Sequence, residues 1–114
     1  MNPPIMGVNK YFLFTLWMGL FAFPAGASPL KAQVFFQKGN AFLQTQQYDR
    51  AITAYTRAIA LQPRFAHAHH KRGTAYYYSK QFKQACHDWK KACQLEQYCM
   101  GWNFGLYRKV CRKE

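Results

Sequence analysis

Small and large apolar residues alternate in a fixed order along the middle of the chain, with polar residues between them. The segment YDRAITAYTRAIALQP, residues 48–63, and the segment FKQACHDWKKACQLEQ, residues 82–97, follow this order at an offset of 34 residues. The matching pairs are Tyr48 and Phe82, Ala51 and Ala85, Tyr55 and Trp89, Ala58 and Ala92, and Leu61 and Leu95. The chain therefore contains an internal repeat.

The repeat predicts two helices in each unit. The same offset pairs Gly39 with Gly73 and Phe42 with Tyr76, so each unit begins with a segment of its own. We expect helices over residues 32–45, 48–62, 66–79 and 82–96. Pro63 ends the first unit, because a proline in the next turn removes a backbone donor and clashes with the preceding carbonyl. The short links make neighbouring helices antiparallel, so the predicted fold class is all-α.

The small residues are expected at the helix crossings. Antiparallel helices that meet closely need small side chains at the crossing and large ones beside it. The first helix of each unit supplies a glycine there, and the second helix supplies two alanines with one aromatic residue between them. The predicted core is therefore Gly39, Ala51, Tyr55, Ala58, Gly73, Ala85, Trp89 and Ala92.

The order of these residues resembles the tetratricopeptide repeat, which has a period of 34 residues. The first unit carries the pattern at Gly39, Phe42, Ala51, Tyr55, Ala58 and Pro63, and the second at Gly73, Tyr76, Ala85, Trp89 and Ala92. Phe35 and His69 stand where the family prefers tryptophan, and Gln97 where it has proline. The resemblance implies a short superhelix of two repeats, residues 32–65 and 66–99.

Two repeats leave an apolar face open, since about three are usually needed to bury one another. The tail GWNFGLYRKVCRKE places Trp102, Leu106 and Val110 on one helical face and adds basic residues at its end. We expect an amphipathic capping helix over residues 101–112, within a C-terminal segment 100–114 that carries a basic tail.

The opening residues differ from the rest. Lys10 is the only charged residue of 1–27, and an uncharged apolar run, residues 11–23, stops at Pro24 before the small residues Ala25-Gly26-Ala27. This layout predicts a signal peptide, residues 1–27, and an exported protein that is periplasmic, lumenal or secreted. The alternative is that residues 11–23 stay as a membrane anchor, although the run is shorter than the roughly 20 residues that span a bilayer.

Four cysteines lie in the last third of this strongly basic chain, whose formal net charge is +12. An even number in an exported small domain suggests disulfides. A helix rises about 1.5 Å per residue, so Cys86 and Cys93 are too far apart on one helix to bond, and Cys99 and Cys111 bracket the capping helix. If the cap runs back along the last helix, the pairs are Cys86–Cys111 and Cys93–Cys99. The alternative of a four-cysteine zinc site lacks the usual close pair.

Catalytic chemistry finds little support in the sequence. The only acidic residues are Asp49, Asp88, Glu96 and Glu114, and none are paired for acid and base roles. His67 and His70 share a helical face, but no further ligand is placed to complete a metal shell. We expect no enzyme activity, no cofactor and no metal site.

The resemblance implies that the first helices of the repeats line a concave face that holds a peptide. The residues expected on that face are Phe36, Asn40, Leu43, His67, His70, Lys71, Thr74, Tyr77 and Tyr78. The family's carboxylate-binding variety has lysine where this chain has Phe36, so we do not expect capture of a free C-terminal carboxylate in that way. The alternative is that the aromatic residues of this face pack inside the superhelix.

The sequence thus predicts a non-catalytic adaptor or scaffold that binds a protein or peptide, with an acidic partner favoured by the charge. The alternative is a basic protein that binds an anionic membrane surface or nucleic acid, and the sequence supports nucleic acid least. Self-association through the open repeat edge is a third hypothesis. The salt dependence of binding separates the charge-driven alternative from a groove-bound peptide. Counterion release makes the affinity of charge-driven binding fall steeply as the salt concentration rises, whereas the affinity for a groove-bound peptide depends on salt less.

Overall fold

The computed structural model describes residues 29–96 and 104–112. These residues form five α-helices: α2 (Pro29–Gln44), α3 (Tyr48–Leu61), α4 (Ala66–Tyr78), α5 (Phe82–Glu96) and α6 (Phe104–Cys111). No strand occurs in either described stretch. The all-α prediction is confirmed, and the four central helices lie within a few residues of their predicted bounds. The predicted signal peptide lies outside the described residues.

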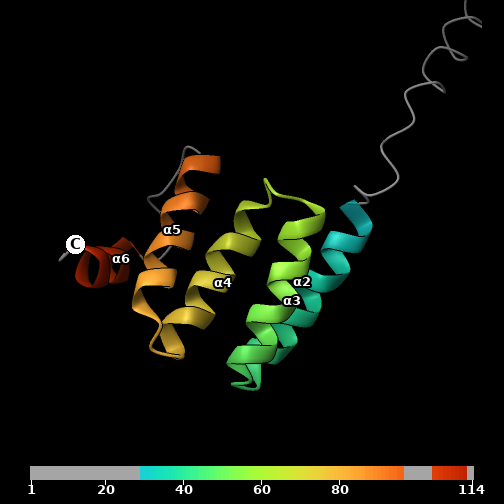
Figure 1. The fold of residues 1–114 in the computed structure, drawn as a ribbon, viewed down its shortest axis with the longest axis horizontal. Helices are drawn as coiled ribbons and strands as arrows, with labels where there is room; N and C mark the ends of the chain where they lie inside the picture. Colours follow the sequence, from blue (N-terminus) through green and yellow to red (C-terminus); the bar gives the residue numbers. More distant parts are fainter. Residues whose placement is uncertain (1–28, 97–103, 113–114) are drawn as a thin grey trace, which may run out of the picture.

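The helices stand side by side in chain order (Figure 1). Helix α2 pairs with α3, and α4 pairs with α5, as two antiparallel hairpins. Helix α3 packs on α4 and joins the hairpins, α2 also contacts α4, and α6 packs on α5. Each hairpin corresponds to one 34-residue unit, so the internal repeat of the sequence is a repeat of structure.

The close helix crossings lie where the small residues predicted them. Ala51, Ala58, Ala85 and Ala92 are completely buried, and Tyr55 and Trp89 are buried beside them. The Tyr55 ring lies directly against the backbone of Gly39, and the Trp89 ring lies in the same way against Gly73, where an added Cβ would be 2.6 Å from Cδ1 of the indole. Each glycine makes room for the aromatic residue of the facing helix, which confirms the predicted core.

The turn inside each hairpin uses one residue in the left-handed backbone region. Gln46 has a φ of 60° and Lys80 a φ of 64°, and these two residues are equivalent in the repeat. The next residue donates its backbone N–H to the helix end in both turns, Gln47 to the Phe42 carbonyl at 2.9 Å and Gln81 to Tyr76 at 2.8 Å. This pattern ends a helix and reverses the chain, and glycine is the residue that usually provides it.

Replacing Gln46 with glycine is expected to stabilise the protein by roughly 0.5–1 kcal/mol, because glycine adopts positive φ without the steric cost that glutamine has there. Gln46→Ala keeps that cost and serves as the matched control. Urea unfolding followed by circular dichroism measures the difference. A glycine variant that is less stable than the alanine variant would show that the turn is not strained at this residue.

A buried charged network joins the two hairpins. Arg72 of α4 donates two hydrogen bonds to the carboxylate of Asp88 on α5, at 2.6 and 2.8 Å, and a third to the hydroxyl of Thr56 on α3, at 3.0 Å. The Asp88 side chain is only 1% exposed. His69 lies between this carboxylate and the Pro63 carbonyl, at 3.5 and 3.0 Å. One arginine therefore ties together three consecutive helices.

The network also sets the charge of Asp88. Burial by itself would raise the pKa of this carboxyl, but the two hydrogen bonds from Arg72 and the nearby His69 ring outweigh burial, so the pKa lies below its usual value. Asp88 is therefore ionised at neutral pH. The stability it contributes is complete above the unfolded-state pKa of about 4 and is lost as the pH falls through the lower folded-state value.

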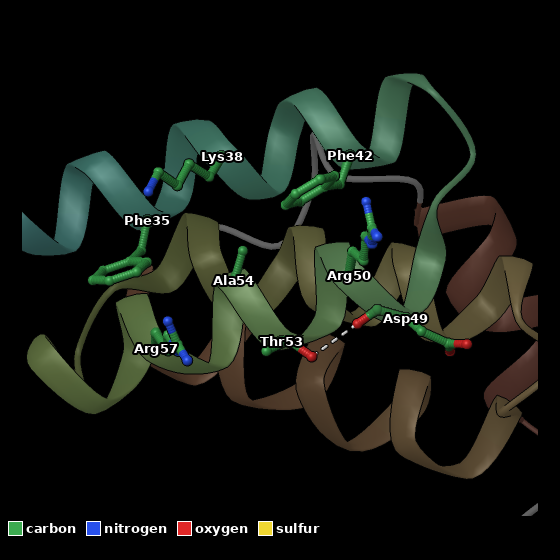
Figure 2. A pocket seen from close by; sticks show the side chains of 8 residues that line it. All are labelled: Phe35, Lys38, Phe42, Asp49, Arg50, Thr53, Ala54 and Arg57. Atoms are coloured by element: carbon green, nitrogen blue, oxygen red, sulfur yellow. Dashed lines mark hydrogen bonds between the residues drawn. The ribbon is translucent and has the colours of Figure 1, made fainter.

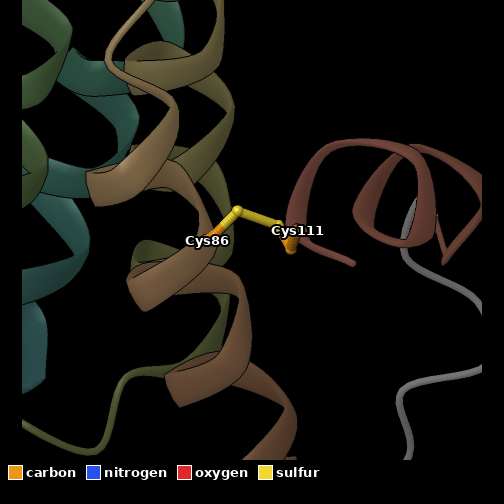
Figure 3. The surroundings of a disulfide bond; sticks show 2 residues. All are labelled: Cys86 and Cys111. Atoms are coloured by element: carbon orange, nitrogen blue, oxygen red, sulfur yellow. A yellow bond between two sulfur atoms is a disulfide. The ribbon is translucent and has the colours of Figure 1, made fainter. Parts of the chain in front are cut away.

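Helix α6 is attached to α5 by a disulfide. Cys86 of α5 is bonded to Cys111 at the end of α6, with their Cα atoms 5.6 Å apart (Figure 3). This is one of the two pairs expected from the sequence. Cys93 is disulfide-bonded as well, and its expected partner Cys99 lies outside the described residues. A sulfur in a disulfide is not the thiolate that a zinc site requires, so Cys86 and Cys111 are not zinc ligands here.

Among the residues that the structure describes, no helix combines the length and apolar character needed to cross a bilayer. The apolar run 11–23 lies outside those residues.

Candidate functional site

The first helices of the two hairpins, α2 and α4, contact each other, and the residues predicted to bind a peptide lie on these two helices. Asn40, His70, Lys71 and Thr74 are partly exposed, and His67 is exposed. They form what we call the α2–α4 face. Its polar part combines an amide, a hydroxyl, two imidazoles and an ammonium group.

Phe36 is a correction to the predicted site. Its side chain is 8% exposed and belongs to the core. The ring lies 5.8 Å from that of Tyr55 and 4.8 Å from that of Phe65, centroid to centroid. Phe65 directly precedes α4, so Phe36 packs between the two hairpins. Leu43 is partly buried and packs on the same core, so neither residue presents a polar group to a ligand.

Asn40 is held by a residue of the core. The buried Tyr55 hydroxyl donates a hydrogen bond of 2.8 Å to Oδ1 of Asn40. Burial raises the pKa of Tyr55, so the phenol keeps its proton and remains the donor. The amide oxygen is occupied from within, and Nδ2 is left on the outer side, 3.4 Å from the exposed Gln37 amide oxygen. The fold thus presents Asn40 to a ligand as a hydrogen-bond donor.

The histidines of the face differ in environment. His67 lies 3.1 Å from a carboxylate oxygen of Glu96 on α5. The pKa of His70 is lowered to about 4, first because the ring is largely buried and then because Lys71 and His67 lie nearby. His70 is therefore neutral at pH 7, and at that pH Lys71 is the charged group beside it.

This shift predicts a loss of stability in mild acid. The unfolded chain takes up a proton on His70 near pH 6.5, whereas the folded protein does so only near pH 4. The unfolded state therefore binds more protons between these values, and the free energy of unfolding falls as the pH drops from about 6.5 to 4. The loss is at most about 3 kcal/mol, and water near the partly exposed ring reduces it.

Urea unfolding at several pH values measures this effect. His70→Gln removes the titrating group and is expected to flatten the profile between pH 6.5 and 4, whereas His87→Gln, at an exposed position, is the control and should leave it unchanged. Equal slopes in wild type and His70→Gln would contradict the assignment. Asp88 contributes only at lower pH, since its pKa is below the ordinary value.

Tyr77 and Tyr78 continue α4 toward its C-terminal end. Tyr77 is partly buried between Phe82 and Trp89, with ring centroids 5.7 and 5.9 Å away. Tyr78 is 54% exposed and stacks on Tyr48 at the start of α3, at 5.5 Å. Tyr77 therefore packs in the core of the second hairpin. Tyr78 is the more exposed of the two tyrosines and has more surface available for contact with a ligand.

A second feature, which sequence reasoning missed, is a groove between α2 and α3. It encloses about 440 Å³ and is lined by Phe35, Lys38, Phe42, Asp49, Arg50, Thr53, Ala54 and Arg57. Figure 2 shows two phenyl rings on α2 facing the α3 residues, with the basic side chains beside the rings. The sequence signal was two phenylalanines and a lysine on one helix, followed by two arginines on the next.

The family follows from comparison with known sequences and structures. The family model of the TPR repeat matches residues 39–80, which run from the crossing glycine of α2 to the turn after α4. Residues 39–80 therefore match the tetratricopeptide repeat, and the described helices have the fold of a TPR domain. Among solved structures it is similar to the first TPR domain of Spaghetti (RPAP3), solved bound to the HSP90 peptide SRMEEVD. That match has a TM-score of 0.69 and 28% identity, and covers 79% of this chain and 73% of the other.

The tetratricopeptide fold accounts for most of the residues discussed above as parts of a repeat unit. Gly39, Ala51 and Tyr55 are the packing residues of the first repeat, and Asn40 is the next residue after its crossing glycine. The position of Phe36, which the family's carboxylate-binding variety fills with lysine, is occupied here by a core residue. In this chain the polar groups of the face therefore begin at Asn40.

The part of the chain that the structure describes offers no metal site. No cluster of three or more histidine, cysteine, aspartate or glutamate side chains there has the geometry to hold an ion. The described polar groups of the α2–α4 face are suited to hydrogen bonding and to contact with negative charge.

Proposed function

We propose that this chain is a non-catalytic protein-interaction module that binds an extended, acidic peptide segment across its α2–α4 face. The observation that carries the proposal is the orientation of Asn40, whose amide oxygen accepts from the buried Tyr55 and whose amide nitrogen donates to the exposed Gln37 side chain at 3.4 Å, on the side open to a ligand. An asparagine oriented in this way is a fixed donor for a peptide carbonyl or carboxylate oxygen. The peptide bound to the similar TPR domain supports the proposal.

The preference for acidic peptides rests on charge. The α2–α4 face carries Lys71, and the chain as a whole has 16 basic and 4 acidic side chains. Such an excess speeds the encounter with acidic partners and favours them over basic ones. Since Phe36 is buried, the face lacks the lysine used by the family's carboxylate-binding variety, and we propose that it recognises internal acidic residues rather than a chain end.

We also propose that the protein works in an exported, oxidising compartment. The support is the Cys86–Cys111 disulfide, since such bonds persist outside the reducing cytosol, together with the signal-like residues 1–27. The alternative is that residues 11–23 anchor the module to a membrane. Fractionation of cells that express the chain, followed by mass measurement of the N-terminus, distinguishes cleavage after Ala27 from an intact anchor.

Selection from a phage-displayed peptide library tests the binding proposal. Oxidised wild-type protein is expected to enrich peptides rich in aspartate and glutamate. Binding of those peptides to the double variant Asn40→Ala, Lys71→Ala should weaken by about tenfold or more, which corresponds to about 1.4 kcal/mol for the loss of a charge-assisted contact and a donor.

The matched control is Lys80→Ala, Lys90→Ala, which removes charge at exposed positions outside the α2–α4 face. It should bind the selected peptides within about twofold of wild type. An equal loss in both double variants would contradict the proposal and favour the charge-driven alternative. That alternative also predicts a steep fall in affinity with salt for all ligands.

A further inference from the structure

The groove between α2 and α3 is a second candidate site, separate from the α2–α4 face. Phe35 and Phe42 are seven residues apart on α2, or about 10 Å along the helix, and they form one wall. Ala54 of α3, which is 6% exposed, lies at the bottom. Because alanine is small, the space between the two phenyl rings can hold apolar side chains of a ligand. Two such side chains, two helical turns apart on the ligand, would each contact one ring.

The groove is also basic. Lys38 and Arg57 lie over the Phe35 ring, 5.5 and 5.6 Å from its centroid, and Arg50 lies 5.8 Å from the centroid of Phe42. No ion pair of the described residues involves these three side chains. Asp49 is the one acidic lining residue, and Figure 2 shows its carboxylate directed away from the rings. The groove therefore combines apolar walls with positive charge that has no acidic partner in the described chain.

The internal repeat indicates what kind of element fits. In the second repeat, His69 and Arg72 are equivalent to Phe35 and Lys38. The chain just before them covers both: the Pro63 carbonyl lies 3.0 Å from the His69 ring, and Thr56 of α3 accepts from Arg72 at 3.0 Å. His69 is buried as a result. In the second repeat, therefore, this end of the groove is closed by a helix and the turn that follows it.

We infer that the α2–α3 groove of the first repeat is a docking site for an acidic amphipathic helix of a partner protein, which presents two apolar residues, two turns apart, to Phe35 and Phe42. Carboxylates beside those residues meet Lys38 and Arg57 at one end and Arg50 at the other. A helix closes the equivalent groove in the second repeat, and the unpaired positive charge selects an acidic one. A second copy of this basic chain would bring like charges together.

A designed peptide tests the inference on the full, oxidised chain. The probe is a fluorescein-labelled, alanine-based helix of about 15 residues with two leucines seven positions apart and glutamates beside them. Fluorescence anisotropy is expected to show binding that weakens about tenfold or more in Lys38→Glu, Arg57→Glu. Lys90→Glu, Lys91→Glu changes the charge equally at exposed positions of α5 and should bind within about twofold of wild type.

Photo-crosslinking independently shows where on the protein the probe binds. A benzoylphenylalanine at Thr53 in the groove is expected to capture the probe, and one at Thr74 on the α2–α4 face is not. Equal weakening by both charge-reversed pairs, crosslinking from Thr74 alone, or equal binding of a probe with serines for leucines would each overturn the inference. Binding only after removal of residues 1–27, or concentration-dependent dimers that the probe dissociates, would assign the groove to this chain itself and overturn it too.

The outcomes for the two sites are separable. The peptide selection depends on Asn40 and Lys71, whereas the helix probe depends on Lys38 and Arg57. Failure of one test leaves the other result unchanged, because the two sets of side chains have no residue in common.

Discussion

Replacing Asp88 with alanine is expected to lower the free energy of unfolding by about 3–5 kcal/mol. The substitution leaves Arg72, whose side chain is 16% exposed, as a largely buried charge without its partner, and it removes the acceptor that ties α4 to α5. Single domains have about 5–15 kcal/mol of stability in total, so the variant should be close to unfolded at 37 °C. Urea unfolding followed by circular dichroism measures the loss.

The double variant Arg72→Met, Asp88→Leu is the control for this prediction. Removing both charges and filling the space with apolar side chains should recover most of the loss, since a buried ion pair costs much of its attraction in desolvation. Asp88→Ala with a loss under about 1 kcal/mol would contradict the account of the network. A double variant as unstable as the single one would show that losing the hydrogen bond from Arg72 to Thr56, which joins α4 to α3, costs as much as leaving the buried charge without its partner.

Removing the Cys86–Cys111 disulfide is expected to cost about 3.5 kcal/mol, by the entropy of closing a loop over a sequence separation of 25 residues. The variant Cys86→Ala, Cys111→Ala leaves α6 attached only by its packing on α5. Hydrogen exchange should then speed up strongly in Phe104–Cys111 and little in α2 and α3, because those helices do not contact α6.

The comparison with Cys86→Ser, Cys111→Ser separates the loss of the bond from the polarity of the side chains that replace the cysteines. Both double variants lack the disulfide and should show the same fast exchange in α6. Protection of α6 equal to that of wild type in either variant would contradict the prediction, because packing alone would then hold the capping helix in place.

Much of the fold was predictable because one physical requirement recurs at a fixed spacing. Close helix crossings need small residues, and Gly39, Ala51 and Ala58 return as Gly73, Ala85 and Ala92. The aromatic residues that fill the adjacent space, Tyr55 and Trp89, were identified as core for the same reason. The turns were predicted by length alone, and the positive φ of Gln46 and Lys80 was not, since neither is a glycine.

The site was less predictable. Whether a residue of a repeat helix is exposed for binding or buried in the core depends on its contacts with other helices, which the repeat pattern does not give. Phe36 was placed on the binding face by its position in the repeat, but Phe65 and Tyr55 enclose it. The sequence of α5 alone does not show that Asp88 is buried. The repeat does indicate it, because the equivalent residue in the first repeat is the small Ala54. A charge at a buried small-residue position requires a partner, and that comparison would have pointed to Arg72.

A ¹⁵N–¹H correlation spectrum of the oxidised chain, recorded during titration with an acidic peptide from the selection, shows directly where the peptide binds. If the peptide binds the α2–α4 face, the resonances that shift are those of Asn40, His70, Lys71 and Thr74, including the Asn40 side-chain amide that Tyr55 orients. Small shifts spread over all lysines and arginines, with the Asn40 amide unmoved, would contradict a binding face on α2 and α4 and leave charge alone as the basis of recognition.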